Sequence, residues 1–360
     1  MTFDVVVVGL GGLGSAAAAA LARRGQRVLG LDRYRPVHDQ GASHGETRIV
    51  RKAYFEGAGY VPLLHRAYEL WDELGLLSRT GGLFLGAPDS RVLAGSLATA
   101  QQWDLPHELL DAAEVHRRFP AFTPPGDTVA LLEHDAGWVS PEAAVGAQLE
   151  RAARAGAELH HEEPVESWQA TPDGVRVTTA RGTYEAGSLV LAPGRWAVDL
   201  MPEVLVPLRV EERRVHFFPG TAGDFAPERF PVWIWERPDG TVPYGAPELG
   251  TGVKASVHHS LVRPAADWSG EDVAELLAPL LPGLGASPLR TLDCTYTLTP
   301  DEHFVVGRHL AHDRVLVACG FSGHGFKLTP VLGEALADLA VDGSTPHDLA
   351  LFDPARPLPA

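Results

Sequence analysis

The chain has 360 residues, a length that suggests two domains. With 45% hydrophobic and 21% charged residues, its composition is typical of a soluble globular protein. Its formal net charge of −16 argues against nucleic acid or an anionic membrane as a general partner, so an anionic ligand would need a local group of cations. Two cysteines are too few for a disulfide framework and no signal peptide precedes the first predicted strand, which together predict a cytoplasmic protein without a membrane anchor.

Residues 4–32 predict a strand, a glycine-rich turn, a helix and a second strand. Residues 5–8 are four valines, as in a parallel strand that is buried on both faces. An alanine-rich helix is predicted over residues 15–24. The turn between them has the pattern G-x-G-x-x-G, formed by Gly9, Gly11 and Gly14. Small residues there allow backbone N–H groups and the helix N-terminus to approach a pyrophosphate.

Asp32 ends the second predicted strand, 18 residues after Gly14. Its carboxylate is placed to accept hydrogen bonds from ribose hydroxyls and would repel a 2′-phosphate, which favours FAD or NAD over NADP. The alternative is a glycine-rich turn in some other α/β domain. The strand, helix and acid around the motif favour the dinucleotide site.

The segment 35–53 carries the first group of cations, among them His44, Arg48, Arg51 and Lys52. Arg48 and Arg51 are three residues apart and are expected to share one face of a helical turn. Arg51 is suited to binding a planar carboxylate. A solvated basic turn is the alternative.

Residues 43–51, SHGETRIVR, with the dinucleotide motif before them, resemble the monomeric sarcosine oxidase and N-methyltryptophan oxidase family of flavoenzymes. The resemblance extends over essentially the whole chain. It implies covalently bound FAD, with His44 and Arg48 against the flavin and Arg51 as a ligand of the substrate carboxylate. Arg33 and Ser43 are assigned to the FAD site with them.

The order of predicted elements indicates a mixed α/β chain with a Rossmann-like FAD-binding domain and an inserted antiparallel-sheet domain. Helices are expected over residues 60–77, 90–103 and 141–155, and short strands over much of 81–138 and 156–196. A buried strand at 188–192 precedes Pro193-Gly194-Arg195-Trp196, where the family has a tryptophan near the flavin. The FAD-binding domain is therefore predicted to be discontinuous, with residues 1–80, 141–206 and 302–360. The substrate domain is predicted to consist of residues 81–140 and 207–301.

Four strands are predicted to form one wall of a pocket, at Arg214–Phe218, Val232–Trp235, Val242–Gly245 and Val253–His258. Lys254 lies inside the last apolar run, where burial of a lysine costs free energy and therefore suggests a functional role. An exposed lysine on an edge strand is the alternative. The resemblance implies that Lys254 activates oxygen and that His258 and Tyr244 belong to the active site, although His259 could take the place of His258.

Residues 291–304, TLDCTYTLTPDEHF, match the family again. The resemblance implies a thioether between Cys294 and the flavin 8α-methyl carbon, with Tyr296 facing the flavin. A buried free cysteine is the alternative, and Cys319 is a lower-ranked candidate for the anchor.

A last buried strand, at 315–318, runs into GFSGHGFK at 320–327 and then a helix over residues 330–341. A glycine-rich turn at a helix N-terminus is an anion site, suited to the negative charge of a reduced flavin. We assign Gly320, Gly323 and Gly325 to the cofactor. The resemblance implies that Lys327 is the second carboxylate ligand, and this lysine is assigned to the cofactor site as well.

The predicted activity is FAD-dependent oxidation of a small N-methyl amino acid such as sarcosine, with O2 as acceptor and with H2O2 and formaldehyde as products. Alternatives are N-methyltryptophan, and cyclic imino acids such as proline or pipecolate. Phe55 stands where relatives commonly carry glycine and would narrow the entrance, which favours the small substrate. An NAD-dependent dehydrogenase and a flavin-binding protein without turnover are further alternatives. The chain is expected to be a monomer and to hold no metal.

Overall fold

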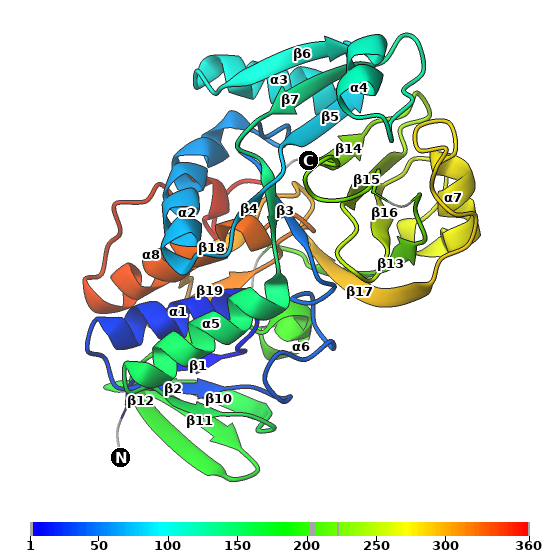
Figure 1. Ribbon diagram of the computed structural model, residues 1–360. Coiled ribbons are helices and arrows are strands. Elements are labelled where there is room, and N and C mark those ends of the chain that lie inside the picture. Colours follow the sequence, from blue (N-terminus) through cyan, green and yellow to red (C-terminus); the bar gives the residue numbers. More distant parts are fainter. Residues whose placement is uncertain (1–2, 202–205, 222, 359–360) are drawn as a thin grey trace.

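The computed structural model describes residues 3–201, 206–221 and 223–358. Two large sheets lie at opposite ends of the molecule, and a small third sheet crosses between them (Figure 1). The predicted mixed α/β fold class is confirmed.

The first sheet is built on parallel strands. Its strands are, in spatial order, β10 (Val165–Thr171), β11 (Gly174–Thr179), β12 (Gly182–Leu191), β1 (Phe3–Val8), β2 (Val28–Leu31) and β9 (Glu158–His160), with β19 (His312–Cys319) beside β12 and β18 (Val305–His309) beside β19. Strand β1 is parallel to both of its neighbours. Val5 and Val7 enter one hydrophobic cluster while Val6 and Val8 enter another, so the valine run is buried on both faces, as predicted.

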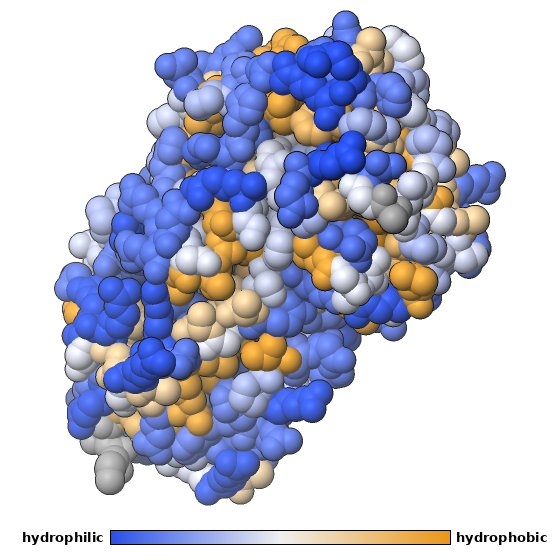
Figure 2. All heavy atoms as spheres, viewed as in Figure 1, coloured by the Kyte–Doolittle hydropathy of each residue, from blue (hydrophilic) through white to orange (hydrophobic). Residues whose placement is uncertain are grey.

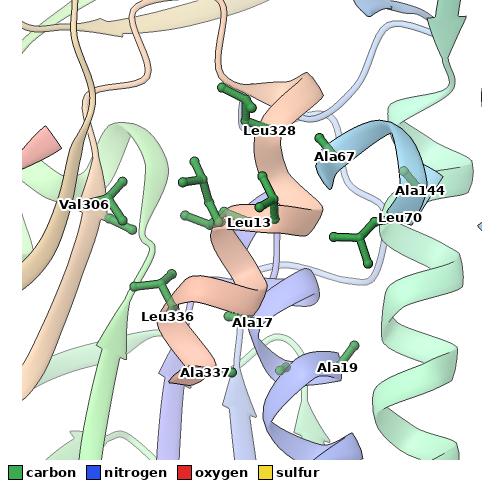
Figure 3. Close-up of a cluster of buried hydrophobic side chains, with 14 of the residues drawn as sticks. Leu13, Ala17, Ala19, Ala67, Leu70, Ala144, Val306, Leu328, Leu336 and Ala337 are labelled. Carbon is green, nitrogen blue, oxygen red and sulfur yellow. The ribbon is translucent and has the colours of Figure 1, made fainter. Parts of the chain in front are cut away.

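One face of this sheet is covered by helices. They are α1 (Gly12–Arg23), α5 (Pro141–Arg154) and α8 (Thr329–Val341), and α2 (Val61–Leu74) packs against α8. Alanines and leucines from all four helices meet in one buried cluster, in which Leu13 and Ala17 of α1 lie beside Leu336 of α8 (Figure 3). The small alanine side chains allow α1 to pack closely between α5 and α8, which fixes the glycine-rich turn at the start of α1.

The second sheet carries most of the predicted pocket wall. Its spatial order is β17 (Arg290–Leu298), β13 (Arg209–Phe218), β16 (Val253–His259), β15 (Val242–Ala246), β14 (Val232–Trp235), β5 (Gly82–Gly86), β7 (Val129–Glu133) and β6 (His107–Asp111). Helices α3 (Arg91–Gln102), α4 (Ala112–Arg118) and α7 (Gly270–Leu277) pack against it. Strand β16 lies between two other strands, so the alternative of Lys254 on an edge strand is wrong.

The third sheet joins β3 (Arg48–Val50), β8 (Gly137–Val139) and β4 (Ser78–Arg79). The expectation that Arg48 and Arg51 share a helical turn is therefore wrong: Arg48 begins a strand, and Arg51 follows its end. The backbone of residues 48–50 pairs with β8, a partner 87 to 91 residues away in the sequence, and this pairing overrides the local preference. The remaining short helices are η1 (Ala58–Tyr60), η2 (Gly194–Trp196), α6 (Ala197–Leu200), η3 (Ala265–Asp267), η4 (Phe326–Leu328) and η5 (Ala350–Phe352).

Most predicted elements lie where expected, with ends shifted by a few residues, whereas α4 was not predicted. The division into two discontinuous domains stays a prediction.

Within the described residues no helix is both long and apolar enough to cross a bilayer. The face shown in Figure 2 is mostly hydrophilic, with hydrophobic residues in scattered groups.

Candidate active site

The first cavity lies at the carboxyl ends of the parallel strands and beside the N-terminus of α1, the usual place for a nucleotide in such a sheet. Among the predicted site residues, its lining includes Gly9, Gly11, Asp32, Arg33, Ser43, Arg48, Cys294, Tyr296, Gly320, Gly323 and Gly325. These come from both ends of the chain, so the cavity joins the first and the last glycine-rich turns.

The turn before α1 is shaped for close contact between backbone segments. A Cβ atom added at Gly14 would lie 1.7 Å from the carbonyl oxygen of Gly9, so a side chain at Gly14 would push the helix away from the strand. The Gly12 N–H donates to Ser43 Oγ at 2.9 Å, which ties the loop after β2 to this turn. This turn fits the pyrophosphate of a dinucleotide.

Asp32 is buried at the end of β2 and accepts hydrogen bonds from the N–H groups of Leu10 (2.7 Å) and Tyr34 (2.8 Å). Burial opposes ionisation, but His38 and these two N–H groups outweigh it and lower the pKa of Asp32. The carboxylate is therefore ionised at neutral pH and is suited to a ribose. Trp196, from the predicted Pro-Gly-Arg-Trp segment, also lines this cavity and contacts the guanidinium of Arg33.

Cys294 lies at the other end of the first cavity. Burial raises the pKa of its thiol, yet the neighbouring His44 side chain and the charge of Arg48 outweigh burial, and the pKa falls to about 7. His44 itself is buried and is not part of the lining of this cavity. Cys319 is fully buried, does not line the cavity, and has its pKa raised to about 12 by burial. Of the two thiols, Cys294 is thus the one able to react as a thiolate.

The last glycine-rich turn packs against Tyr296. A Cβ atom at Gly323, whose φ is +80°, would come within 2.3 Å of the Tyr296 ring. The absence of a side chain there keeps both residues at the wall of the cavity. Together with the pyrophosphate turn, Asp32 and the Cys294 thiol, this geometry fits FAD.

A second cavity opens next to the first and has a volume of about 80 Å³. Among the predicted site residues its lining includes Arg48, Arg51, Tyr244, Lys254, His258, Cys294, Tyr296, Gly323 and Lys327. Five residues line both cavities and form a shared wall: Arg48, Cys294, Tyr296, Gly323 and Phe326. A ligand in the second cavity and a cofactor in the first would therefore contact the same wall.

Arg51 is one of two buried cations at one end of the second cavity. Its Nη2 donates to both carboxylate oxygens of Glu56 at 2.6 Å, and its guanidinium lies 4.3 Å and 4.4 Å from the ring centroids of Tyr54 and Phe55. Burial raises the pKa of Glu56, but the charge of Arg51 outweighs it and lowers the pKa to about 2. An internal carboxylate therefore already contacts the predicted carboxylate ligand.

Lys327 is the second cation at this end. Its Nζ donates to the carbonyl oxygen of His324 at 2.6 Å and to Tyr54 Oη at 3.2 Å. Burial and the charge of Arg51 lower the pKa of Lys327 to about 7. Lys327 lines the second cavity and not the first, so the structure gives no contact for its predicted role toward the cofactor.

Lys254 lies on the sheet side of the second cavity, at 3% exposure. Its Nζ donates to the carbonyl oxygens of Gly45 (2.8 Å) and Thr47 (2.7 Å), in the loop that leads into β3. Burial, followed by the charge of Arg48, lowers its pKa well below the usual value. A cation from the second sheet is thus held against the cofactor-binding loop.

His258 also lines the second cavity, with its Nδ1 3.2 Å from Tyr296 Oη, whereas His259 is exposed. Burial lowers the pKa of His258 to about 3, so the imidazole is neutral. Burial raises the pKa of Tyr244, which faces the ring of His258. The structure thus brings His258, and not His259, to this wall.

Sequence reasoning missed Arg213, a cation on β13 that lines the second cavity. It stands in the polar run E-E-R-R at residues 211–214, which in sequence looks the same as a solvent-exposed edge strand. The alternation of side chains along the predicted strand was the signal that could have placed it inward.

Comparison with known proteins is consistent with this geometry. The family described as FAD dependent oxidoreductase matches residues 4–339. A monomeric sarcosine oxidase of Streptomyces avermitilis is 48% identical, over 99% of this chain and 98% of that protein. An N-methyl-L-tryptophan oxidase of Salmonella heidelberg is 35% identical over 99% of both chains. Among solved structures, NikD, described as an unusual amino acid oxidase, is 28% identical with a TM-score of 0.84, over 98% of this chain and 97% of that one.

Proposed function

The chain belongs to the FAD-dependent oxidoreductase family, and from that premise we propose that it oxidises small N-methyl amino acids such as sarcosine, with O2 as electron acceptor. It is an FAD-dependent enzyme that acts on the CH–NH group of its donor. For sarcosine, one molecule each of substrate, O2 and water would give glycine, formaldehyde and H2O2.

The wall shared by the two cavities is the observation that carries this proposal. It brings a small, cation-rich cavity against the end of the cofactor site where Cys294 lies. Arg51 and Lys327 offer two cations to a carboxylate, which would orient the N-methyl group toward the shared wall. FAD, when bound, supplies the two-electron acceptor for the substrate C–H bond.

We propose that Cys294 holds FAD covalently through a thioether to the 8α-methyl carbon. Its thiol has a pKa of about 7, which provides a substantial thiolate fraction at neutral pH. The neighbouring His44 side chain and the charge of Arg48 favour this ionised form. Neither His44 nor Arg48 acts on Cys319, which is not part of the cavity lining.

Lys254 is proposed to assist the reaction with O2. A protonated amine there would stabilise negative charge that develops on oxygen, and it would do so from a fixed position because two backbone carbonyls orient it. The neutral imidazole of His258, on the same sheet face, is able to accept a hydrogen bond from the substrate amine.

The size of the second cavity supports a small substrate. One water needs roughly 10–15 Å³ of such a space, so a cavity of about 80 Å³ suits a small amino acid with a short side chain. Sarcosine meets this limit, whereas N-methyltryptophan requires the half-buried Phe55 or its neighbours to move. The proposed substrates are therefore small secondary amino acids, of which sarcosine is the simplest.

Peroxide formation with a panel of amines tests the proposal. Sarcosine and N-methylalanine should be oxidised, with less activity on proline and pipecolate and least on N-methyltryptophan. Activity confined to N-methyltryptophan would contradict the size argument. Yellow, folded protein that oxidises none of them would contradict the proposed function itself.

We further propose that the enzyme is a cytoplasmic monomer. The monomeric state is named for the 48% identical relative, and the two cysteines are free and buried. Light scattering on the purified protein should give a mass near 38.6 kDa plus that of the cofactor.

A further inference from the structure

Arg213 is a buried cation that the proposed chemistry does not use. It lies on β13 directly opposite Cys294 of β17, so the two side chains project from the same face of the second sheet. The residue is 7% exposed and lines the second cavity but not the first. Its guanidinium therefore faces the substrate side of the shared wall.

The hydrogen bonds of Arg213 are incomplete. Nη1 donates to the carbonyl oxygen of Glu212 at 2.9 Å and lies 2.8 Å from Glu211 Oε2, and the guanidinium is 4.6 Å from the ring centroid of Tyr296. Nε is buried and has no hydrogen-bond partner among the described residues. Buried arginine N–H groups nearly always have a hydrogen-bond acceptor, so the Nε–H of Arg213 is expected to bind an acceptor on a ligand.

The charges around the second cavity indicate what that partner is. Its described lining contains a single carboxylate, Glu56, and five basic side chains: Arg48, Arg51, Arg213, Lys254 and Lys327. Glu211, which pairs with Nη1 of Arg213, lies outside this lining. Glu56 is committed to Arg51, and the α-carboxylate of a substrate would bind between Arg51 and Lys327. In a chain with a net charge of −16, a cavity with this surplus of cations selects for anions.

We propose that Arg213 is a specificity-determining residue that binds a second carboxylate, on the side chain of the substrate, so that N-methylated amino dicarboxylic acids such as N-methylaspartate are preferred to sarcosine. This inference rests on the proposed function, because it assumes that the α-carboxylate lies at Arg51 and Lys327. The Nε–H and the adjacent Nη2–H of a guanidinium form an edge that matches the two oxygens of a carboxylate. Bound there, the second carboxylate would supply the missing acceptor for Nε.

Binding of two simple acids to the FAD-loaded enzyme tests the inference without turnover. Succinate and butyrate have the same carbon chain, and only succinate has the second carboxylate. The dissociation constant of each is read from the change in the flavin absorption spectrum. Wild-type enzyme should bind succinate about 10- to 100-fold more tightly than butyrate, the range for a charge-assisted pair in a partly buried site.

Arg213→Gln should remove the preference for succinate and change butyrate binding less than about threefold. Arg214→Gln is the matched control, because Arg214 is the adjacent residue on β13, is exposed, and points to the opposite face of the sheet. It carries the same loss of charge and should keep the preference. Arg213→Lys should retain part of the preference, which guards against a folding defect in the glutamine variant.

Turnover gives a second, independent readout. The ratio of kcat/KM for N-methylaspartate to that for sarcosine should exceed one in wild type and fall about 10- to 100-fold in Arg213→Gln. If sarcosine is oxidised but both the ratio and the succinate preference survive in Arg213→Gln, the inference is overturned. An equal loss of butyrate and succinate binding would also overturn it, because Arg213 would then act only by holding Tyr296.

The proposed function can fail separately from this inference. If no secondary amine is oxidised by the yellow wild-type protein, the proposed function is wrong. The comparison of succinate with butyrate still decides whether Arg213 binds a second carboxylate.

Discussion

The Nη2 atom of Arg48 lies 3.9 Å from the Sγ atom of Cys294, across the junction of the first cavity and the second sheet. This contact joins a strand of the third sheet to β17 and places a permanent positive charge beside the thiol. Together with the neighbouring side chain of His44, it explains why a thiol at 7% exposure has a pKa near 7, when burial by itself would raise that pKa.

Replacement of Cys294 by serine should abolish covalent attachment of FAD. Acid-precipitated wild-type protein should show a fluorescent band on a denaturing gel, and Cys294→Ser should not. Cys319→Ser is the control and should keep the band, since Cys319 is the last residue of β19 and is enclosed in the core. A fluorescent band in Cys294→Ser together with its loss in Cys319→Ser would show that the anchor is the other cysteine.

Lys254→Met should slow the reaction of the substrate-reduced enzyme with O2 by about 100-fold or more, because a fixed charge near developing negative charge is removed. Anaerobic reaction with sarcosine should change only several-fold. Stopped-flow absorbance resolves the two half-reactions.

The reaction with O2 should also depend on pH. Burial lowers the pKa of Lys254, so the rate with O2 in wild type should fall as pH rises through that lowered pKa, and this dependence should vanish in the variant. Equal losses in both half-reactions would indicate that Lys254 only supports the fold.

Binding of methylthioacetate, a carboxylate without an amine, should depend on the protonation of Lys327. The pKa of Lys327 in the free protein is about 7, so the cationic form that attracts a carboxylate is present below pH 7 and is lost above it. The dissociation constant should be constant from about pH 6 to 7 and rise roughly tenfold per pH unit above that. The bound carboxylate raises the pKa of the lysine, so calorimetry near pH 8 should detect proton uptake.

Lys327→Met is the control for this pH dependence. It should bind methylthioacetate about 30- to 1000-fold more weakly, with little change across the same pH range. A wild-type affinity that is flat up to pH 9 would mean that Lys327 does not contact the carboxylate.

Phe55→Ala should widen the substrate range. The ring of Phe55 lines the second cavity and stacks on Arg51, and the backbone of residue 55 packs against Gly95 of α3. Its removal opens space next to the carboxylate end, so kcat/KM for N-methyltryptophan relative to sarcosine should rise at least about tenfold. The peroxide assay measures both. The kcat/KM for sarcosine should fall several-fold, because the cation–π contact with Arg51 is weakened. An unchanged ratio would show that another residue limits substrate size.

The parts of the fold that local sequence determines were predictable. The valine run of β1, the glycine spacing and Asp32 lie within 32 residues, and each acts through its immediate neighbours. The resemblance supplied Cys294, Lys254, His258, Arg51 and Lys327, all of which the structure brings to the two cavities.

Features that depend on long-range pairing were not predictable in this way. Arg48 lies in a strand because β3 pairs with β8, and the helical spacing from Arg48 to Arg51 had no influence on this. Arg213 faces the cavity because β13 pairs with β17 in a register that places it opposite Cys294, about 80 residues later. Neither register is visible in the residues around these arginines.

The shared wall also separates residues whose evolution is constrained by both cavities from residues that contact the second cavity alone. Changes at Arg48, Cys294, Tyr296, Gly323 or Phe326 would alter both cavities at once, so they are constrained by the cofactor as well as by the substrate. Phe55, Arg213, Val215 and Ile234 line the second cavity alone. Mutation at these four positions can change which amine is accepted while the redox chemistry stays intact, and divergence of substrate range among descendants of this chain is expected to accumulate there.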